Sequence, residues 1–337
     1  MAHRIRSNKC IKGINILNPE DNCEVKLLQY ADDTLFFVSD KRSLKTINSE
    51  LDLFAKVAGP KLNKSKTVIM WLGNSTSKWS IDDLGLSWTD TPIKYLGFYI
   101  APDMDKARTL NWENKLTKLQ KLLDNWRKRK LTLFGRITIV KSLALSKIVH
   151  ILMVETIPDI ILKKINSILF AFIWQTKVEK VKRKIMTRQF DKGGVNMIDL
   201  QNQKSSFRLR WLGRALAARE GIWNKMCFHW FNVIGGLELL FNSDFEICNL
   251  KSICNGLLPS FYEEILEAWV QIKKHTCMRN HPTVHGIHYE ILWHNSNVKF
   301  NNNTLYYKEW FKNGIVFLGD VFKNGSFIPV KDNLFVT

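Results

Sequence analysis

The segment of residues 27–38, which reads LLQYADDTLFFV, constrains the fold of this chain most, because it sets two adjacent carboxylates between two apolar runs. Apolar runs rich in Leu, Phe and Val around a short polar interval are typical of a β-hairpin, which would place Asp32 and Asp33 at its tip. Like charges this close repel each other. A divalent cation relieves the repulsion, and Mg²⁺ prefers carboxylate oxygens. The alternative is an ordinary acidic turn, since Asp is common in turns.

A helix is predicted directly after this hairpin, because apolar residues recur at helical spacing over residues 44–58. Ser43 can cap the N-terminus of that helix, and Gly59 can end it. Taken together, residues 1–104 predict strands, one helix and hairpins, which is an α+β arrangement.

From about Lys106 the pattern becomes helical. Residues 133–154 predict a second long helix, Pro158 begins a third that runs to Trp174, and a basic helix follows at about residues 200–218. The first of these helices carries one apolar stripe: Trp112, Leu116, Leu119, Leu123 and Trp126. Such aromatic rings could stack on bases, but their helical spacing favours packing into a core. Short connections favour a helical bundle.

The chain is strongly basic, with 50 Lys and Arg against 31 Asp and Glu and a formal charge of +19. An excess of this size indicates a polyanionic partner, and nucleic acid is the first candidate. The alternatives are a membrane surface, for which no amphipathic basic anchor stands out, and ordinary solvated faces. Three basic clusters carry the expectation of phosphate contacts: Arg127, Lys128, Arg129 and Lys130; Lys180, Lys182, Arg183, Lys184 and Arg188; Arg208, Arg210 and Arg214.

Several blocks occur in a characteristic order, beginning with YADD at residues 30–33 and GPKLNKSKT at residues 59–67, and this ordered set resembles the reverse transcriptases of LINE-type (non-LTR) retrotransposons. Tyr30-Ala31-Asp32-Asp33 matches the Tyr-x-Asp-Asp box of reverse transcriptases, and GPKLNKSKT at residues 59–67 resembles the segment after the palm helix. IKYLGFYI at residues 93–100 resembles the primer-grip hairpin. Further blocks are similar to the thumb helix and the region beyond it: LFGRITIVK at 133–141, IW at 173–174, GGVNMIDL at 193–200 and LWHN at 292–295. The order of the blocks is much more specific than the box alone.

The resemblance implies a right-hand polymerase fold: a partial palm at residues 1–104, a helical thumb at 105–180 and a basic, mixed and mostly helical C-terminal region at 181–337. It also implies RNA-directed DNA polymerase activity on an RNA template and a DNA primer or target, with metal-dependent nucleotidyl transfer.

By the same resemblance, Asp32 and Asp33 would hold catalytic Mg²⁺, and Tyr30 would support the primer terminus. Lys66 would protonate the leaving pyrophosphate, although a solvated surface lysine is the alternative. The primer grip would be lined by Tyr95, Leu96 and Gly97, against the alternative of a plain hairpin core. Gly97 would let the backbone approach the primer closely. Nucleic-acid contacts are expected from Arg127, Lys128, Arg129, Lys130, Lys182, Arg183 and Lys184.

One part of the family pattern is missing from these residues. The family places a second metal-binding Asp on an earlier palm strand, whereas here only residues 1–29 precede Tyr30, and their sole Asp, Asp21, lies in a turn-like NPEDN sequence. We therefore expect the fingers and the first catalytic Asp to be absent, and the chain alone to be inactive as a polymerase. The alternatives are a non-catalytic nucleic-acid-binding protein derived from the element, and a pseudogene product without a role.

The cysteines show no disulfide-framework spacing and no signal peptide is visible, so we expect an intracellular, reducing location, nuclear or cytoplasmic. No apolar run approaches the roughly 20 residues of a membrane helix.

A zinc site is disfavoured because the spacing of the candidate ligands matches no knuckle, and Pro282 and Gly286 interrupt them. Those candidates are Cys277, His281, His285 and His288. The sequence leaves the template, the target site and the oligomeric state open.

Overall fold

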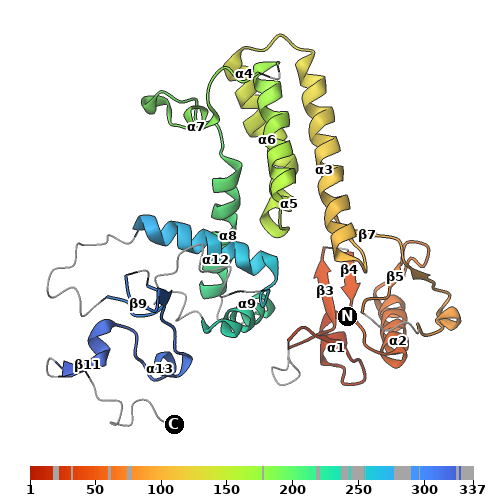
Figure 1. The fold of residues 1–337 in the computed structure, drawn as a ribbon. Coiled ribbons are helices and arrows are strands. Elements are labelled where there is room, and N and C mark those ends of the chain that lie inside the picture. Colours follow the sequence, from red (N-terminus) through yellow and green to blue (C-terminus); the bar gives the residue numbers. More distant parts are fainter. Residues whose placement is uncertain are drawn as a thin grey trace. The chain divides into compact units, whose positions relative to one another are not determined.

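The computed structural model divides the chain into two compact units, Met1–Met197 and Ile198–Thr337 (Figure 1). Each unit is described separately. The structure describes all residues except 18–22, 32, 60–61, 74–77, 177, 218–220, 237–242, 244–253, 255, 277–289, 296, 324–325 and 328–337.

The first unit begins with short elements around one hairpin. Antiparallel strands β3 (Leu27–Tyr30) and β4 (Asp33–Phe36) form the predicted hairpin, with Tyr30 opposite Asp33. Helices α1 (Ala2–Ser7) and α2 (Lys41–Ala58) accompany it, as does the antiparallel pair of β1 (Ile14–Asn15) and β2 (Glu24–Val25). A small core joins these elements, because the following side chains pack together: Ile5, Ile11, Leu27 and Ile47.

Helix α2 begins two residues earlier than its expected cap. Asp40 is the N-cap, and its carboxylate accepts a hydrogen bond from the backbone N–H of Ser43. Ser43 is instead buried inside the helix, and its hydroxyl oxygen accepts from the N–H of Lys12 at 2.7 Å. The prediction of Ser43 as the cap is therefore wrong, because Asp40 caps the helix by accepting from the N–H of Ser43 itself. Gly59 ends the helix at a φ of 88°, as predicted.

The following stretch contains two further strand pairs. Strands β5 (Ile69–Met70) and β6 (Trp88–Thr89) pair in parallel, on either side of the 3₁₀ turn Asp82–Leu84. Strands β7 (Ile93–Tyr95) and β8 (Phe98–Ile100) form a second antiparallel hairpin, with Tyr95 opposite Phe98. The parallel pair differs from the expectation of antiparallel hairpins alone.

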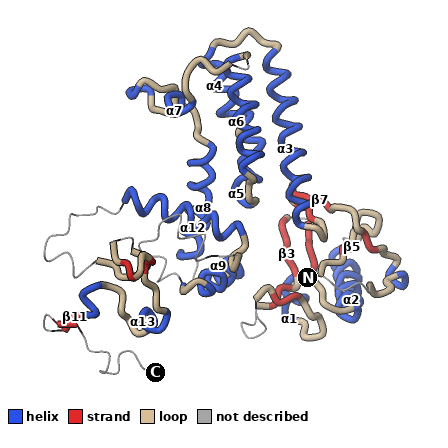
Figure 2. The backbone as a smooth tube through the Cα atoms, viewed as in Figure 1, coloured by secondary structure: helices blue, strands red, loops and turns tan. Residues whose placement is uncertain are grey.

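Residues 104–174 are mainly helical, as predicted, but a π-helical turn and a bend interrupt the single long helix expected at residues 133–154 (Figure 2). The helical elements are α3 (Met104–Arg127), α4 (Leu133–Ile139), a π-helical turn (Val140–Ala144), α5 (Ser146–Val154) and α6 (Asp159–Trp174). Helix α3 contacts α5 and α6, and four residues of its predicted apolar stripe are buried: Trp112, Leu116, Leu119 and Leu123. Core packing of this stripe is confirmed for these four; Trp126 is half-buried.

Within the described residues, no single helix has both the length and the apolar composition to cross a membrane. Residues 133–154 meet those two criteria only as a pair of segments, and a bend of 46° separates them. Much of their apolar surface is already occupied, because Val140, Ile148 and Ile151 are buried within the first unit.

The last elements of the first unit are the short helix α7 (Arg183–Met186) and the 3₁₀ turn Phe190–Lys192. The chain after this turn runs back alongside α7, since the N–H of Met197 donates to the carbonyl of Met186 at 2.9 Å. Gly194 lies at the closest approach, because an added Cβ would stand 2.1 Å from the carbonyl oxygen of Arg188.

The second unit is mostly helical in its described part. It contains α8 (Leu200–Ala217), α9 (Ile222–Val233), α12 (Ser260–Thr276), β9 (Lys299–Phe300), β10 (Asn303–Thr304), α13 (Lys308–Lys312), a 3₁₀ turn (Leu318–Val321), β11 (Phe322–Lys323) and β12 (Ser326–Phe327). Helices α8, α9 and α12 pack around an aromatic core that includes Phe231, Tyr262 and Trp293.

The α+β class is confirmed: hairpins and one long helix in residues 1–100, then a mainly helical remainder. The division at residues 104 and 180 into palm, thumb and C-terminal region stays a prediction.

Candidate functional site

The β3–β4 hairpin presents its acidic end to solvent. Tyr30 is 66% exposed, and Asp33 opposite it is exposed at the start of β4. The strands are joined through Ala31, whose φ of 51° lies in the left-handed region. That region costs an L-residue with a side chain roughly 1–2 kcal/mol, so the hairpin holds its end in a strained conformation. Asp32, the first predicted metal ligand, lies outside the described residues.

Asp33 is available for a cation as far as the described residues extend. Its carboxylate has no hydrogen bond or ion pair with any of them, and the backbone of β4 holds it at the hairpin end. Mg²⁺ in phosphoryl-transfer sites is commonly bound through one or two carboxylates plus substrate phosphates. The residue types at this end therefore fit a magnesium ion that substrate helps to bind, with Asp33 as one ligand.

The β7–β8 hairpin repeats this local design and brings the predicted primer-grip residues together. Its two central residues, Leu96 and Gly97, have φ of 47° and 86°, as the tight turn favoured in hairpins requires. Leu96 is exposed and Tyr95 is half-buried. Gly97 lies against His150 of α5, since a Cβ there would stand 3.7 Å from the imidazole Cε1.

Lys66 lies in the turn that follows α2, with its side chain exposed. Its backbone N–H donates to the Asn63 side-chain oxygen at 3.2 Å. No hydrogen bond or ion pair connects it to Tyr30 or Asp33 within the described part of the chain, so its role as a general acid stays a prediction.

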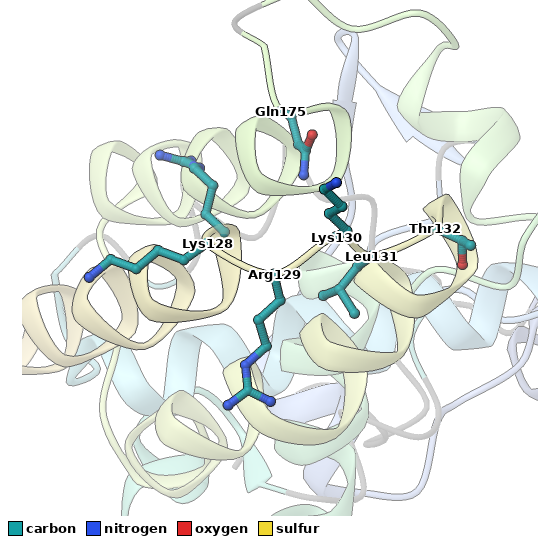
Figure 3. Close-up of a pocket in the computed structure, with 7 residues that line it drawn as sticks. Lys128, Arg129, Lys130, Leu131, Thr132 and Gln175 are labelled. Carbon is teal, nitrogen blue, oxygen red and sulfur yellow. The ribbon is translucent and has the colours of Figure 1, made fainter.

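The four predicted basic residues at the end of α3 and in the connection to α4 line one pocket of about 490 Å³ (Figure 3). Its lining consists of Arg127, Lys128, Arg129, Lys130, Leu131, Thr132 and Gln175. Lys130 extends toward the end of α6 at Gln175, whereas Arg129 extends to the opposite side of the connection (Figure 3). Four consecutive cations around an open hollow make a surface that suits an anionic group.

Both arginines of this pocket already have partners. Arg129 lies 4.3 Å from the ring centroid of Trp126, and Arg127 pairs with Asp124 at 3.4 Å on the exposed surface. Such surface pairs are weak and leave the charge available to a stronger anion.

The other predicted basic clusters differ in exposure. Lys182 and Lys184 are exposed, whereas Arg183 binds Glu179 through two nitrogens and lies 4.8 Å above the ring of Phe170. In the second unit Arg208 is fully buried and pairs with Glu264 at 2.7 Å. The expectation of a phosphate contact at Arg208 is therefore wrong, because its charge is used inside the core.

Sequence reasoning missed a group of cations that the fold gathers beside the β7–β8 hairpin. We name it the lysine face, and it consists of Lys94, Lys115, Lys118 and Lys147. Lys115 is half-buried, and that burial together with the three neighbouring lysines lowers its pKa. The spacing of Lys115 and Lys118 could have indicated one helix face, but nothing in the sequence joins it to β7 and α5.

The candidate zinc ligands Cys277, His281, His285 and His288 lie outside the described residues. In the part of the chain that the structure describes, no three His, Cys, Asp or Glu side chains gather into a possible metal site.

Comparisons with known proteins show what residues 5–100 and the chain as a whole are similar to. Residues 5–100 match the family described as reverse transcriptase (RNA-dependent DNA polymerase). A curated relative, the "Transposon TX1 uncharacterized 149 kDa protein" of Xenopus laevis, is 23% identical over 278 residues, which cover 78% of this chain. The chain spans only about 20% of the length of that relative. The predicted resemblance to a retrotransposon reverse transcriptase is thereby confirmed as a similarity: residues 5–100 match the reverse transcriptase family, and most of the chain is similar to a transposon protein.

Proposed function

We propose that this chain contains part of the palm, the thumb and the region after it of an RNA-directed DNA polymerase that copies the RNA of a retrotransposon onto a DNA primer. The observation that carries the proposal is the exposed Asp33 at the end of the β3–β4 hairpin, inside the segment that matches the reverse transcriptase family. Tyr30 beside it would support the primer terminus.

The metal proposed here is Mg²⁺, with Asp32 and Asp33 as its protein ligands. When bound, the ion would stabilise charge on the transferring phosphate and lower the pKa of the primer hydroxyl. The chain's own residues would position the strand: the β7–β8 turn at Leu96 and Gly97 would contact the primer backbone. Lys66 would donate a proton to the pyrophosphate leaving group.

We further propose that residues 1–337 expressed on their own do not extend a primer. One carboxylate pair without the fingers and the earlier Asp does not complete a two-metal site, and positioning supplies much of the rate in phosphoryl transfer. Primer extension with magnesium, comparing the wild-type chain with Asp32→Ala, tests this. We expect no extension from either; extension by the wild type that Asp32→Ala abolishes would contradict it.

The polymerase proposal itself is tested by supplying the missing parts. Fusion of a fingers and first-palm segment from a related reverse transcriptase to residue 1 should give magnesium-dependent extension that Asp33→Asn abolishes. Asp90→Asn is the matched control, because Asp90 is 76% exposed in its side chain and pairs with the surface Lys78. Equal activity of the Asp33→Asn fusion and its Asp90→Asn counterpart would refute the assigned role of the hairpin.

A second candidate function is nucleic-acid binding without catalysis. It is favoured by the pocket at residues 127–132, where four consecutive cations stand together. Binding through several phosphates weakens steeply as salt rises. Steep salt dependence of binding to labelled RNA and DNA, without extension by the fusion protein, would favour this candidate over the polymerase.

We also propose an intracellular location, nuclear or cytoplasmic. The support is chemical: Cys23, Cys227 and Cys254 are buried as free thiols, and burial raises the pKa of Cys227 to about 12. Such thiols are inert packing residues.

A further inference from the structure

The lysine face is assembled where α3 docks on the β7–β8 hairpin. The side chain of Asn111 accepts from the N–H of Tyr99 at 2.7 Å and donates to its carbonyl at 3.0 Å. Asn114, one turn further along α3, donates to the Tyr99 hydroxyl at 3.3 Å. This face of the helix is therefore fixed against β8, and Lys115 and Lys118 continue along it.

Helix α5 closes the same region from the other side. His150 packs against Phe98 with ring centroids 4.5 Å apart and lies over Gly97. Lys147 stands one helical turn before His150 and so shares its side of α5. On the hairpin, Lys94 lies opposite Tyr99. Three separate elements thus direct positive charge to one place.

Within the described residues none of these four lysines forms an ion pair, and only burial and the other three lysines shift the pKa of Lys115. The lysines are close enough to influence one another, because Lys94, Lys118 and Lys147 each lower the pKa of Lys115. Unbalanced like charges in a folded protein oppose folding. An arrangement that costs stability and has no internal partner is explained by an external polyanion.

We propose that the lysine face binds consecutive phosphates of one nucleic-acid strand beside the β7–β8 turn. This rests on the proposed function and names the surface that would hold the strand there. Lys115 and Lys118 are separated by about 4.5 Å along the helix axis, which is comparable to the rise of roughly 3.4 Å between successive phosphates.

The strand has a continuation along α3. From Lys115 to Arg129, which lines the basic pocket, the helix and its end span about 21 Å. At roughly 3.4 Å per nucleotide this corresponds to about six nucleotides. The lysine face and the pocket therefore lie about six nucleotides apart along α3, and both belong to the first unit.

The test is fluorescence anisotropy with the full chain, a labelled 20-nucleotide DNA, the same sequence as RNA, and the RNA–DNA duplex, at several salt concentrations. The variant K115Q/K147Q should weaken binding about tenfold at low salt and reduce the dependence of log Kd on log salt by about 1.5–2. The control K163Q/K164Q removes the same charge from the exposed surface of α6 and should change binding less than about twofold.

Two controls distinguish a loss of binding from a loss of folding. K115R/K147R keeps the charge and should restore binding to near the wild-type value. The melting temperature of K115Q/K147Q should be equal to or above that of the wild type, because repulsion is removed.

Equal weakening by K115Q/K147Q and K163Q/K164Q would overturn the lysine face, as would failure of K115R/K147R to bind. In either case wild-type binding would leave the proposed polymerase role standing. A wild-type chain that binds none of the three probes would refute the lysine face, whereas the fusion assay decides the polymerase role by itself. Preference among the probes identifies which strand lies on the face.

Discussion

At the scale of single residues, the two hairpin turns differ in how far the sequence predicts their backbone conformation. Ala31 and Leu96 both have positive φ, and each follows a tyrosine that ends a strand. Gly97 is readable as a turn residue, because glycine occupies this region without cost. The left-handed φ of Ala31 cannot be predicted from its residue type, since the strand pairing around it imposes that conformation. Such strain at the end of an acidic hairpin is consistent with a site that must be held rigidly.

His294 gives the chain a predictable response to acid. Its ring stacks on Tyr306 with centroids 4.9 Å apart, and burial lowers its pKa from 6.5 to about 4. Between those values the unfolded chain binds a proton that the folded chain does not, so stability is complete above pH 6.5 and falls as the pH drops to 4. The loss amounts to roughly 3 kcal/mol at most.

The substitution His294→Asn should flatten this dependence, because it removes the titrating group and Asn tolerates the φ of 52° at this position. Urea unfolding of the second unit between pH 4 and 7 measures it. The exposed His3 provides the matched control, since His3→Asn should leave the slope unchanged. An unaltered slope in His294→Asn would mean that other groups are responsible for it.

At the scale of elements, the stability of the segment after α6 should depend more on Gly194 than on its neighbour Gly193. A Cβ at Gly194 would stand 2.1 Å from the carbonyl oxygen of Arg188, whereas one at Gly193 meets nothing within 4 Å. Gly194→Ala should therefore separate the two backbone stretches and cost more than about 2 kcal/mol. Gly193→Ala should cost only about 1 kcal/mol, for its φ of 72°.

Chemical denaturation of the two variants checks the order. Hydrogen exchange should show that Gly194→Ala exposes the N–H of Asn196, which donates to the Arg188 carbonyl at 2.8 Å. Equal costs for the two variants would show that this close approach can relax.

Element boundaries followed well from the sequence where a periodic pattern met a punctuating residue. The helix over residues 159–174 begins after Pro158, and α2 ends at Gly59, as expected. The N-cap of α2 was misjudged, since Asp40 and Ser43 are both good caps and only the position of the chain before them decides which one is used. The parallel pairing of β5 and β6 carries no sequence signature, because short strands pair according to what surrounds them.

At the scale of the whole molecule, the division into two units predicts that a destabilising substitution in one unit leaves the stability of the other unchanged. Glu264 in the second unit is 13% exposed in its side chain and pairs with the fully buried Arg208. Glu264→Gln removes the carboxylate that pairs with this guanidinium and with the buried Lys204, and breaking a buried ion pair typically costs about 3–5 kcal/mol.

Hydrogen exchange with mass spectrometry should then show faster exchange in peptides from residues 198–337 and unchanged exchange in those from residues 1–197. Glu309→Gln, whose side chain is 66% exposed, is the control and should have little effect on either unit. Acceleration in both units after Glu264→Gln would show that they unfold together.

The sequence by itself determined the acidic hairpin, the helical region after residue 104 and the resemblance to a reverse transcriptase, because these depend on residues adjacent in the chain. The four basic residues at 127–130 were likewise visible as a run, and the fold places them around one pocket. Only the tertiary structure decided that Arg208 is an internal charge and that lysines from β7, α3 and α5 face one another. The physical reason is that burial and Coulombic interaction depend on distance in space, which sequence separation does not fix.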